Sequence, residues 1–241
     1  MPLLAVKDLK KSFGGLAAVD GVSFDLASGA LTALVGPNGC GKSTLFNLIT
    51  GALAADGGRI IFDGNDITGL PAYRIARAGI GRKFQVPAVF DELTVLENLT
   101  APKWVSKRLP LFSTPQAGDV GTILELVGLH DRREAWAGDL SHGQKQWLEI
   151  GMLLASPAHL LLLDEPTAGM TFDETARTAD LLQQIIATGE HTVLVIEHDM
   201  GFVERLGCPV MVMARGKIMR SGAYRDLRQD PDIKELYFGQ A

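Results

Sequence analysis

The sequence has only two cysteines, and we expect no secretory leader. Cys40 and Cys208 stand alone, a pattern that argues against a disulfide framework and against a zinc site. Near the N-terminus, the charged residues Lys7 and Asp8 come before an apolar leader segment could form. The prediction is therefore a cytosolic chain without disulfides.

Long apolar runs and an excess of basic residues are also missing. A membrane-spanning helix needs about eighteen or more apolar residues in a row, whereas the longest runs here, at residues 160–163 and 210–214, are as short as buried strands. The formal net charge of −5 argues against a nucleic-acid partner, because nucleic acids are usually met by a basic face. We expect a chain that is soluble when isolated and reaches a membrane only by docking onto another protein.

The order of the predicted elements indicates an α/β protein with a mainly parallel sheet and antiparallel strands near the N-terminus. Strands at residues 6–13 and 21–26 are joined across Gly14 and Gly15, and a short apolar strand at 31–35 runs into a glycine-rich turn. Further strands are expected at residues 59–62, 160–163, 192–196 and 210–213, and helices at 43–50, 71–78, 94–104, 120–127 and 144–154.

The middle of the chain differs from its two ends. Between residues 86 and 156 the predicted elements are helical, and nothing between them has the pattern of a strong strand. Residues 107–118 are rich in proline and polar side chains, as surface loops are. We therefore expect a single domain of residues 1–241, in which a helical subdomain at 86–156 is inserted into a core formed by 1–85 and 157–241.

A glycine-rich segment follows the strand at residues 31–35. It fits the pattern G-x-x-x-x-G-K-[ST] and consists of Gly36, Pro37, Asn38, Gly39, Cys40, Gly41, Lys42, Ser43 and Thr44. The glycines let backbone N–H groups turn inward around an anion, and the helix that follows adds its positive N-terminal end. Lys42 supplies a point charge for the β- and γ-phosphates, and Ser43 supplies a hydroxyl for Mg²⁺. We predict a nucleotide site at this phosphate loop, residues 36–44, within a P-loop NTPase core.

The apolar strand at residues 160–163 ends in two carboxylates, Asp164 and Glu165. A strand that is buried on both faces places such side chains at the carboxyl edge of a parallel sheet, beside the phosphate loop. There Asp164 is expected to hold Mg²⁺ through water, and Glu165 to polarise the attacking water. Either acid alone would fit a polar strand end or a helix cap equally well, so the pairing with the phosphate loop carries this prediction.

Ser141, His142, Gly143 and Gln144 open the helix that precedes the acidic strand. A serine and a glycine at a helix N-terminus point a hydroxyl and backbone N–H groups at an anion. In isolation such a segment is an ordinary helix cap. Together with the phosphate loop and the paired acids, this signature segment, residues 141–144, resembles the signature sequence of the ABC ATPase family, with His142 in place of the usual first glycine.

The resemblance to the ABC ATPase family covers nearly the whole chain and implies roles for further residues. Phe13 stands where the family places an aromatic ring that stacks on adenine, although a strand aromatic also fits a core position. Gln85 matches the glutamine that contacts Mg²⁺ and the attacking water, and His198 matches the switch histidine that contacts the γ-phosphate. The chain departs from the family at Thr171, where many members carry an aspartate that acts across the dimer.

The family resemblance also implies how the chain works. Two ATPase subunits pack head to tail with ATP between them, so that the phosphate loop of one faces the signature segment of the other. Loss of phosphate after hydrolysis removes charge-assisted hydrogen bonds worth about 1.5–3 kcal/mol each, enough to bias an open–closed equilibrium. The helical subdomain passes this motion to two transmembrane permease subunits at the cytoplasmic face of the inner membrane, and a periplasmic protein delivers the solute.

Some stretches resemble one group within the family, the ATPases of branched-chain amino-acid importers. They are residues 79–85, 90–98 and 235–239. Within that group, residues 140–152 and 168–171 are most similar to the urea-importer ATPase, and they contain the uncommon residues His142, Trp147 and Thr171.

The resemblance therefore implies uptake of a small polar solute, urea or a short amide, with branched-chain amino acids as the alternative. Thr167 and Cys40 depart from the urea branch and leave room for a relative that imports another amide or amino acid. The dimer partner implied is a second, related ATPase, with a homodimer as the other arrangement.

Two other classes of protein share part of this pattern. A non-transport ABC ATPase would carry every catalytic motif, but such proteins usually need a long coiled-coil insertion, zinc modules or a second ATPase unit, and the sequence shows none of these. A phosphate-loop kinase of small molecules would share the loop but has no need of the signature segment or of His198. A transporter ATPase is the prediction that both features favour.

Overall fold

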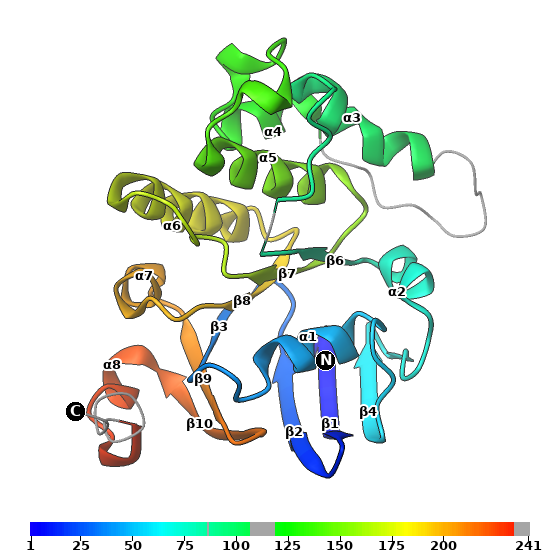
Figure 1. The fold of residues 1–241 in the computed structure, drawn as a ribbon, viewed down its shortest axis with the longest axis vertical. Coiled ribbons are helices and arrows are strands. Elements are labelled where there is room, and N and C mark those ends of the chain that lie inside the picture. The colour runs from blue at the N-terminus through cyan, green and yellow to red at the C-terminus, as the bar shows by residue number, and fades with distance from the viewer. Residues whose placement is uncertain (86, 107–118, 234–241) are drawn as a thin grey trace.

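The strands form two sheets in the computed structural model, which describes residues 1–85, 87–106 and 119–233 (Figure 1). The antiparallel sheet has the order β2-β1-β4-β5. Its strands are Leu4–Phe13 (β1), Leu16–Leu26 (β2), Gly57–Phe62 (β4) and Asn65–Asp66 (β5). This antiparallel unit near the N-terminus confirms the predicted arrangement, and β2 begins at Leu16 rather than at residue 21.

The second sheet has the order β10-β9-β3-β8-β7-β6. It is parallel from β9 to β6, and β10 runs antiparallel at one edge. Its strands are Leu31–Val35 (β3), Ile80–Lys83 (β6), Leu160–Asp164 (β7), Thr192–Ile196 (β8), Pro209–Ala214 (β9) and Lys217–Ala223 (β10). The expected α/β fold is therefore present.

Helices cover the parallel sheet, and α3, α4 and α5 gather at one end of the molecule (Figure 1). The α-helices are Lys42–Ile49 (α1), Ala72–Ala78 (α2), Val95–Ser106 (α3), Val120–Leu126 (α4), His142–Ala155 (α5), Phe172–Ala187 (α6), Met200–Leu206 (α7) and Tyr224–Leu227 (α8), with short 3-10 turns at His130–Arg132 and Ala137–Asp139. None of the helices in the described part of the chain combines the length and the apolar composition needed to cross a membrane.

The parallel sheet separates two hydrophobic cores because successive side chains of a strand point to opposite faces. In β7, Leu161 and Leu163 pack with the helices α3 to α7, whereas Leu160 and Leu162 pack with α1 and the antiparallel sheet. All five residues of β7 are buried, as they are in β3 and β8. This double burial explains the unbroken apolar runs in the sequence.

The strand β6 is not predicted by its own residues. Of its four residues only Ile80 is a good strand former, and a glycine and two cations complete the segment. The strand forms because its backbone pairs in parallel with β7, from Ile80 opposite Leu160 to Lys83 opposite Leu163. The predicted surface loop at 107–118 and the terminal resemblance at 235–239 lie outside the described residues.

A buried ion pair fixes α5 to the end of β6. The Nζ atom of Lys83 lies 3.6 Å from Oε2 of Glu149, and Lys83 is fully buried. Nζ also donates to the carbonyl oxygen of Phe84 at 2.9 Å, and the backbone N–H groups of Phe84 and Ala88 face the carboxylate. Burial lowers the pKa of the Lys83 amine and raises the pKa of the Glu149 carboxyl, while the opposite charge of each partner counteracts the shift.

Removing one member of this pair should be costly. Lys83→Met leaves Glu149 as a buried charge without its cation, and the free energy of unfolding should fall by about 3–5 kcal/mol. Adding Glu149→Gln removes the uncompensated charge, so the double variant should regain much of that loss in guanidinium chloride titrations. As a control, Lys145→Met breaks the surface pair with Asp91 and should cost less than about 1 kcal/mol. If Lys83→Met and the double variant had the same free energy of unfolding, the pairing would be contradicted.

Candidate functional site

Parallel pairing brings the ends of three strands to one level of the sheet. Leu34 of β3 and Asp164 of β7 both pair with Ile196 of β8. The segments that follow these strands therefore leave the sheet side by side. They carry the phosphate loop, the paired acids and the histidine that the sequence singled out.

The phosphate loop has no room for side chains at two of its glycines. A Cβ atom at Gly36 would collide with the carbonyl oxygen of Met213, and one at Gly41 with the carbonyl oxygen of Ala18. Gly41 also has a φ of 111°, in the left-handed region that glycine adopts without strain. The loop is thus packed between β2 and β9, and its glycines are needed for that close approach as well as for an inward-facing backbone.

Lys42 is folded back onto the loop that precedes it. The side chain is nearly buried, and Nζ donates to the carbonyl oxygens of Gly36 at 2.6 Å and Pro37 at 3.1 Å. Charge-assisted bonds to an anion are stronger than bonds to neutral carbonyls, so a phosphate oxygen is a better partner for this ammonium group. Ser43 is exposed in the first turn of α1, where the positive end of the helix also favours an anion.

Glu165 meets two of the predicted residues. Gln85 donates from Nε2 to Oε2 of Glu165 at 3.0 Å, and Nδ1 of His198 lies 3.5 Å from Oε1. Glu165 has a φ of 46°, a conformation that is uncommon for residues other than glycine and that occurs often at functional sites. Two side chains, from the segments after β6 and β8, therefore converge on the carboxylate that follows β7.

Asp164 is held by Arg82, a residue to which the sequence pattern assigned no role. Nη2 of Arg82 lies 2.8 Å from Oδ2 of Asp164, and Nη1 donates to Asn47 at 2.5 Å. The guanidinium group lies over the rings of Phe46 and Phe84. Arg82 falls in the stretch 79–85 that resembles the importer group, but only strand pairing shows which acid it faces.

Glu197 is a second contributor that the sequence did not reveal. Only 1% of the residue is exposed, and its Oε1 accepts from the backbone N–H and the hydroxyl of Thr167 at 3.2 and 2.7 Å. Burial raises the pKa of this carboxyl, and the hydrogen bonds from Thr167 counteract the shift. The residue ties the end of β8 to the segment after Glu165, directly before His198.

The signature segment begins α5 as a capping box. The N–H group of Gln144 donates to the Ser141 hydroxyl at 3.2 Å, and the N–H group of Ser141 donates to the Gln144 side chain at 3.0 Å. Ser141 and His142 are exposed. Among the described residues, no hydrogen bond or ion pair joins this segment to the phosphate loop.

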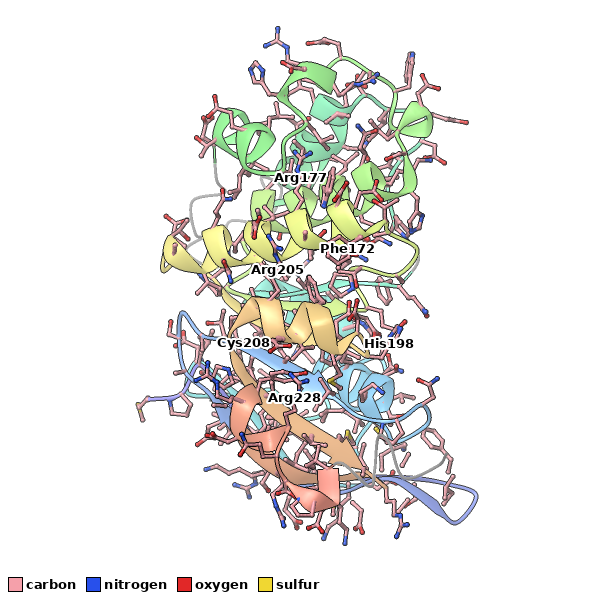
Figure 2. All side chains as sticks on the ribbon, turned by 90° about the vertical axis from the view of Figure 1, so that its left-hand side faces the viewer. Phe172, Arg177, His198, Arg205, Cys208 and Arg228 are labelled. Carbon is pink, nitrogen blue, oxygen red and sulfur yellow. The ribbon has the colours of Figure 1, made fainter. Side chains whose placement is uncertain are left out.

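The uncommon residue Trp147 has a structural role in α5. Its indole N–H donates to the hydroxyl of Thr178 in α6 at 2.9 Å. Arg177 reaches from α6 towards α4 and α5 (Figure 2), with its guanidinium carbon 4.2 Å from the Trp147 ring centroid and a 3.3 Å hydrogen bond to the carbonyl of Gly128. Thr171 likewise serves the fold, because it caps α6 in a capping box with Glu174.

Phe13 lies at the end of β1 and is 47% exposed. The ammonium group of Lys11 is 5.6 Å from its ring centroid. Such exposure disfavours the core role that the sequence left open, and it leaves ring surface for stacking.

The side-chain oxygens at this site suit Mg²⁺ rather than a metal ion whose ligands all come from the protein. Among the described residues, no group of three or more His, Cys, Asp or Glu side chains is placed to hold a metal ion. Mg²⁺ commonly takes one or two protein oxygens and completes its shell with water and substrate phosphates. Ser43 and Asp164 offer such oxygens, and Arg82 occupies only Oδ2 of the aspartate in the described contacts.

Comparison with known proteins agrees with this geometry. The family model described as ABC transporter matches residues 19–168, more than half of the chain. Two high-affinity branched-chain amino acid transport ATP-binding proteins, LivG of Escherichia coli (strain K12) and BraF of Pseudomonas aeruginosa, are each 36% identical over 252 residues. These alignments cover 100% of this chain and 99% of each relative.

Solved structures are similar over the full length as well. A nucleotide-free ATP-binding cassette from an ABC transporter has a TM-score of 0.85 at 33% identity, and the ADP conformation of the cassette MJ1267 has a TM-score of 0.86 at 34% identity. Each comparison covers 100% of both chains. This chain therefore belongs to the ABC transporter family and is an ATP-binding subunit that hydrolyses ATP to drive import.

Proposed function

We propose that the chain is the ATPase subunit of an importer of branched-chain amino acids. LivG and BraF are named for that transport, and their similarity extends over the whole chain. This supports the alternative solute over urea or a short amide, an expectation that rested on two short stretches. Two of their uncommon residues, Trp147 and Thr171, have packing and capping roles here.

The observation that carries the proposed chemistry is the convergence of Gln85 and His198 on Glu165, beside the phosphate loop. ATP binds with its β- and γ-phosphates in the glycine cradle, where Lys42 exchanges its carbonyl partners for phosphate oxygens. Phe13 stacks on the adenine ring. The parallel sheet places the phosphate loop and Glu165 at one edge before ATP binds, so the main rearrangement on binding is the exchange of partners by Lys42.

Glu165 accepts the proton of the attacking water as general base. Gln85 and His198 hold its carboxylate from two sides, and His198 also donates towards the γ-phosphate. Ser43, Asp164 and Gln85 are the side chains that would hold Mg²⁺. When bound, the ion neutralises charge on the β- and γ-phosphates.

A second ATPase subunit completes the site. Ser141 and His142 are exposed, and the signature segment has no hydrogen bond to the phosphate loop of its own chain in the described structure. The capping box engages the N–H groups of Ser141 and Gln144, which leaves the Ser141 hydroxyl proton and the N–H groups of His142 and Gly143 to ATP on a head-to-tail partner. The partner is a related ATPase, with a homodimer as the other arrangement. Lacking an apolar spanning helix in its described part, the chain docks onto two permease subunits at the cytoplasmic face, and a periplasmic protein binds the solute.

The helical subdomain predicted at residues 86–156 is described at residues 87–106 and 119–156, and we propose that it moves with ATP. In the described part of this range α3, α4 and α5 share one hydrophobic core with the parallel sheet. The Lys83–Glu149 pair connects α5 to the strand that leads into Gln85. A change at Gln85 is thereby passed to the helices that face the permeases.

The solute is tested by uptake in source cells that lack this chain. Uptake of labelled leucine should return when these cells receive the wild-type chain and stay low when they receive Lys42→Ala. Urea uptake should be the same in the two complemented strains. Loss of urea uptake with normal leucine uptake would restore the urea assignment.

Lys42→Ala should weaken ATP binding itself. The substitution removes charge-assisted bonds to phosphate, so the dissociation constant of a fluorescent ATP analogue should rise about ten- to a hundredfold. Lys7→Ala changes an exposed lysine outside the site and serves as the matched control. Equal affinity of Lys42→Ala and wild type would contradict the nucleotide site.

Glu165→Gln should separate binding from turnover. The amide keeps the shape of the side chain but cannot accept a proton, so ATP hydrolysis by the assembled transporter should fall at least about a hundredfold while ATP affinity stays near wild type. Glu190→Gln, an exposed substitution in the turn before β8, is the control. Near-normal hydrolysis by Glu165→Gln would remove this residue from the role of general base.

A further inference from the structure

The side chain of His142 connects the signature segment to the loop that follows Glu165. Its Nε2 atom lies 2.9 Å from the carbonyl oxygen of Ala168. A carbonyl can only accept, so the ring donates from Nε2 in this arrangement. A glycine at this position, as is usual in the family, would lack the side chain that makes the bond.

The two segments fit closely around this bond. Gly169 has a φ of 74°, and a Cβ atom on it would lie 3.2 Å from Nε2 of His142. One position further, a Cβ atom on Gly143 would collide with the carboxylate of Glu174, which Thr171 holds in the capping box of α6. Glycines at both contact points therefore allow the signature segment to rest directly on the loop.

The loop continues from Ala168 to the catalytic carboxylate. The N–H group of Ala168 donates to the carbonyl oxygen of Glu165 at 3.1 Å, which closes a tight turn. Glu165 itself has the left-handed backbone that makes this turn possible. A shift of Glu165 is therefore transmitted to the Ala168 carbonyl and to the ring that donates to it.

His142 also has a second partner. Nε2 of Gln146 lies 3.2 Å from Nε2 of His142, and Gln146 is fully buried with its Oε1 unpaired in the described structure. One ring nitrogen cannot donate to Ala168 and accept from Gln146 at the same time. The Nε2 atom can therefore make one of two hydrogen bonds, as donor to Ala168 or as acceptor from Gln146.

We infer that His142 is a positioning residue that couples the two ATP sites of the dimer. The inference rests on the proposed head-to-tail assembly, in which Glu165 serves the chain's own ATP and the signature segment serves the partner's ATP. The bond from His142 to Ala168 joins these two sites within one subunit. It supplies a connection that Thr171 does not, because the Thr171 hydroxyl and N–H group are both engaged with Glu174.

The first test uses the isolated chain, labelled with ¹⁵N-histidine and assigned through His142→Gln and His130→Gln. A non-hydrolysable ATP analogue should shift the ring ¹⁵N signals of His142, although the nucleotide binds at the phosphate loop of the same chain. His130 is exposed beside Asp131, and its signals should not move. In Lys42→Ala the His142 signals should also stay in place.

The outcomes of this test separate the coupling from the function itself. Nucleotide binding, measured by fluorescence, with unmoved His142 signals would overturn the coupling and leave the ATPase assignment intact. Absence of nucleotide binding to the wild-type chain would overturn the proposed function instead, and the coupling with it.

The second test uses the assembled transporter. With two coupled sites, the Hill coefficient for ATP hydrolysis should fall from about 2 in wild type towards about 1 in His142→Gly, which keeps the signature backbone. His142→Gln can still donate to Ala168 and should restore part of the cooperativity, and His130→Gly should leave it unchanged. An unaltered Hill coefficient in His142→Gly would refute the coupling.

Discussion

The site depends on the parallel pairing of β3, β8 and β7. Hydrogen bonds between these strands set Leu34 and Asp164 opposite the same residue, Ile196, so that the loops after all three strands leave the sheet at one edge. Burial on both faces makes the register costly to change, because a slip of one residue would exchange the two hydrophobic cores. The position of the phosphate loop relative to the paired acids thus follows from backbone geometry and apolar burial.

The helix α5 is the second organising element, because polar contacts hold it to the core at three points. Glu149 forms an ion pair with Lys83, two residues ahead of Gln85 in the sequence. Trp147 donates a hydrogen bond to α6, and His142 bonds to the loop that follows Glu165. A buried ion pair costs desolvation energy and contributes little net stability, but its loss on one side is expensive. Contacts of this kind define position more than they add stability. The proposed passage of motion from nucleotide to helices requires such defined positions.

Much of the site was readable from sequence because its motifs are local. A strand, a glycine loop and a helix in succession specify the phosphate loop, and an apolar strand that ends in acids specifies Asp164 and Glu165. The role of Arg82 could not be predicted from the sequence. Arg82 reaches Asp164 only because β6 pairs with β7, and the residues of β6 do not themselves predict a strand. The resemblance to the urea importer rested on short stretches, and the full-length relatives support the proposed branched-chain amino acids better. The uncommon residue Trp147 in those stretches packs against α6.

The sequence by itself determined the fold class, the phosphate loop, the paired acids and the family, because each of these depends on residues that are neighbours along the chain or on periodic apolar burial. Only the tertiary structure decided which groups surround Glu165 and which ones engage His142. Those contacts join residues far apart in the sequence, and their distances depend on strand register and on how closely two glycine-bearing segments approach. No local pattern of residues encodes such distances.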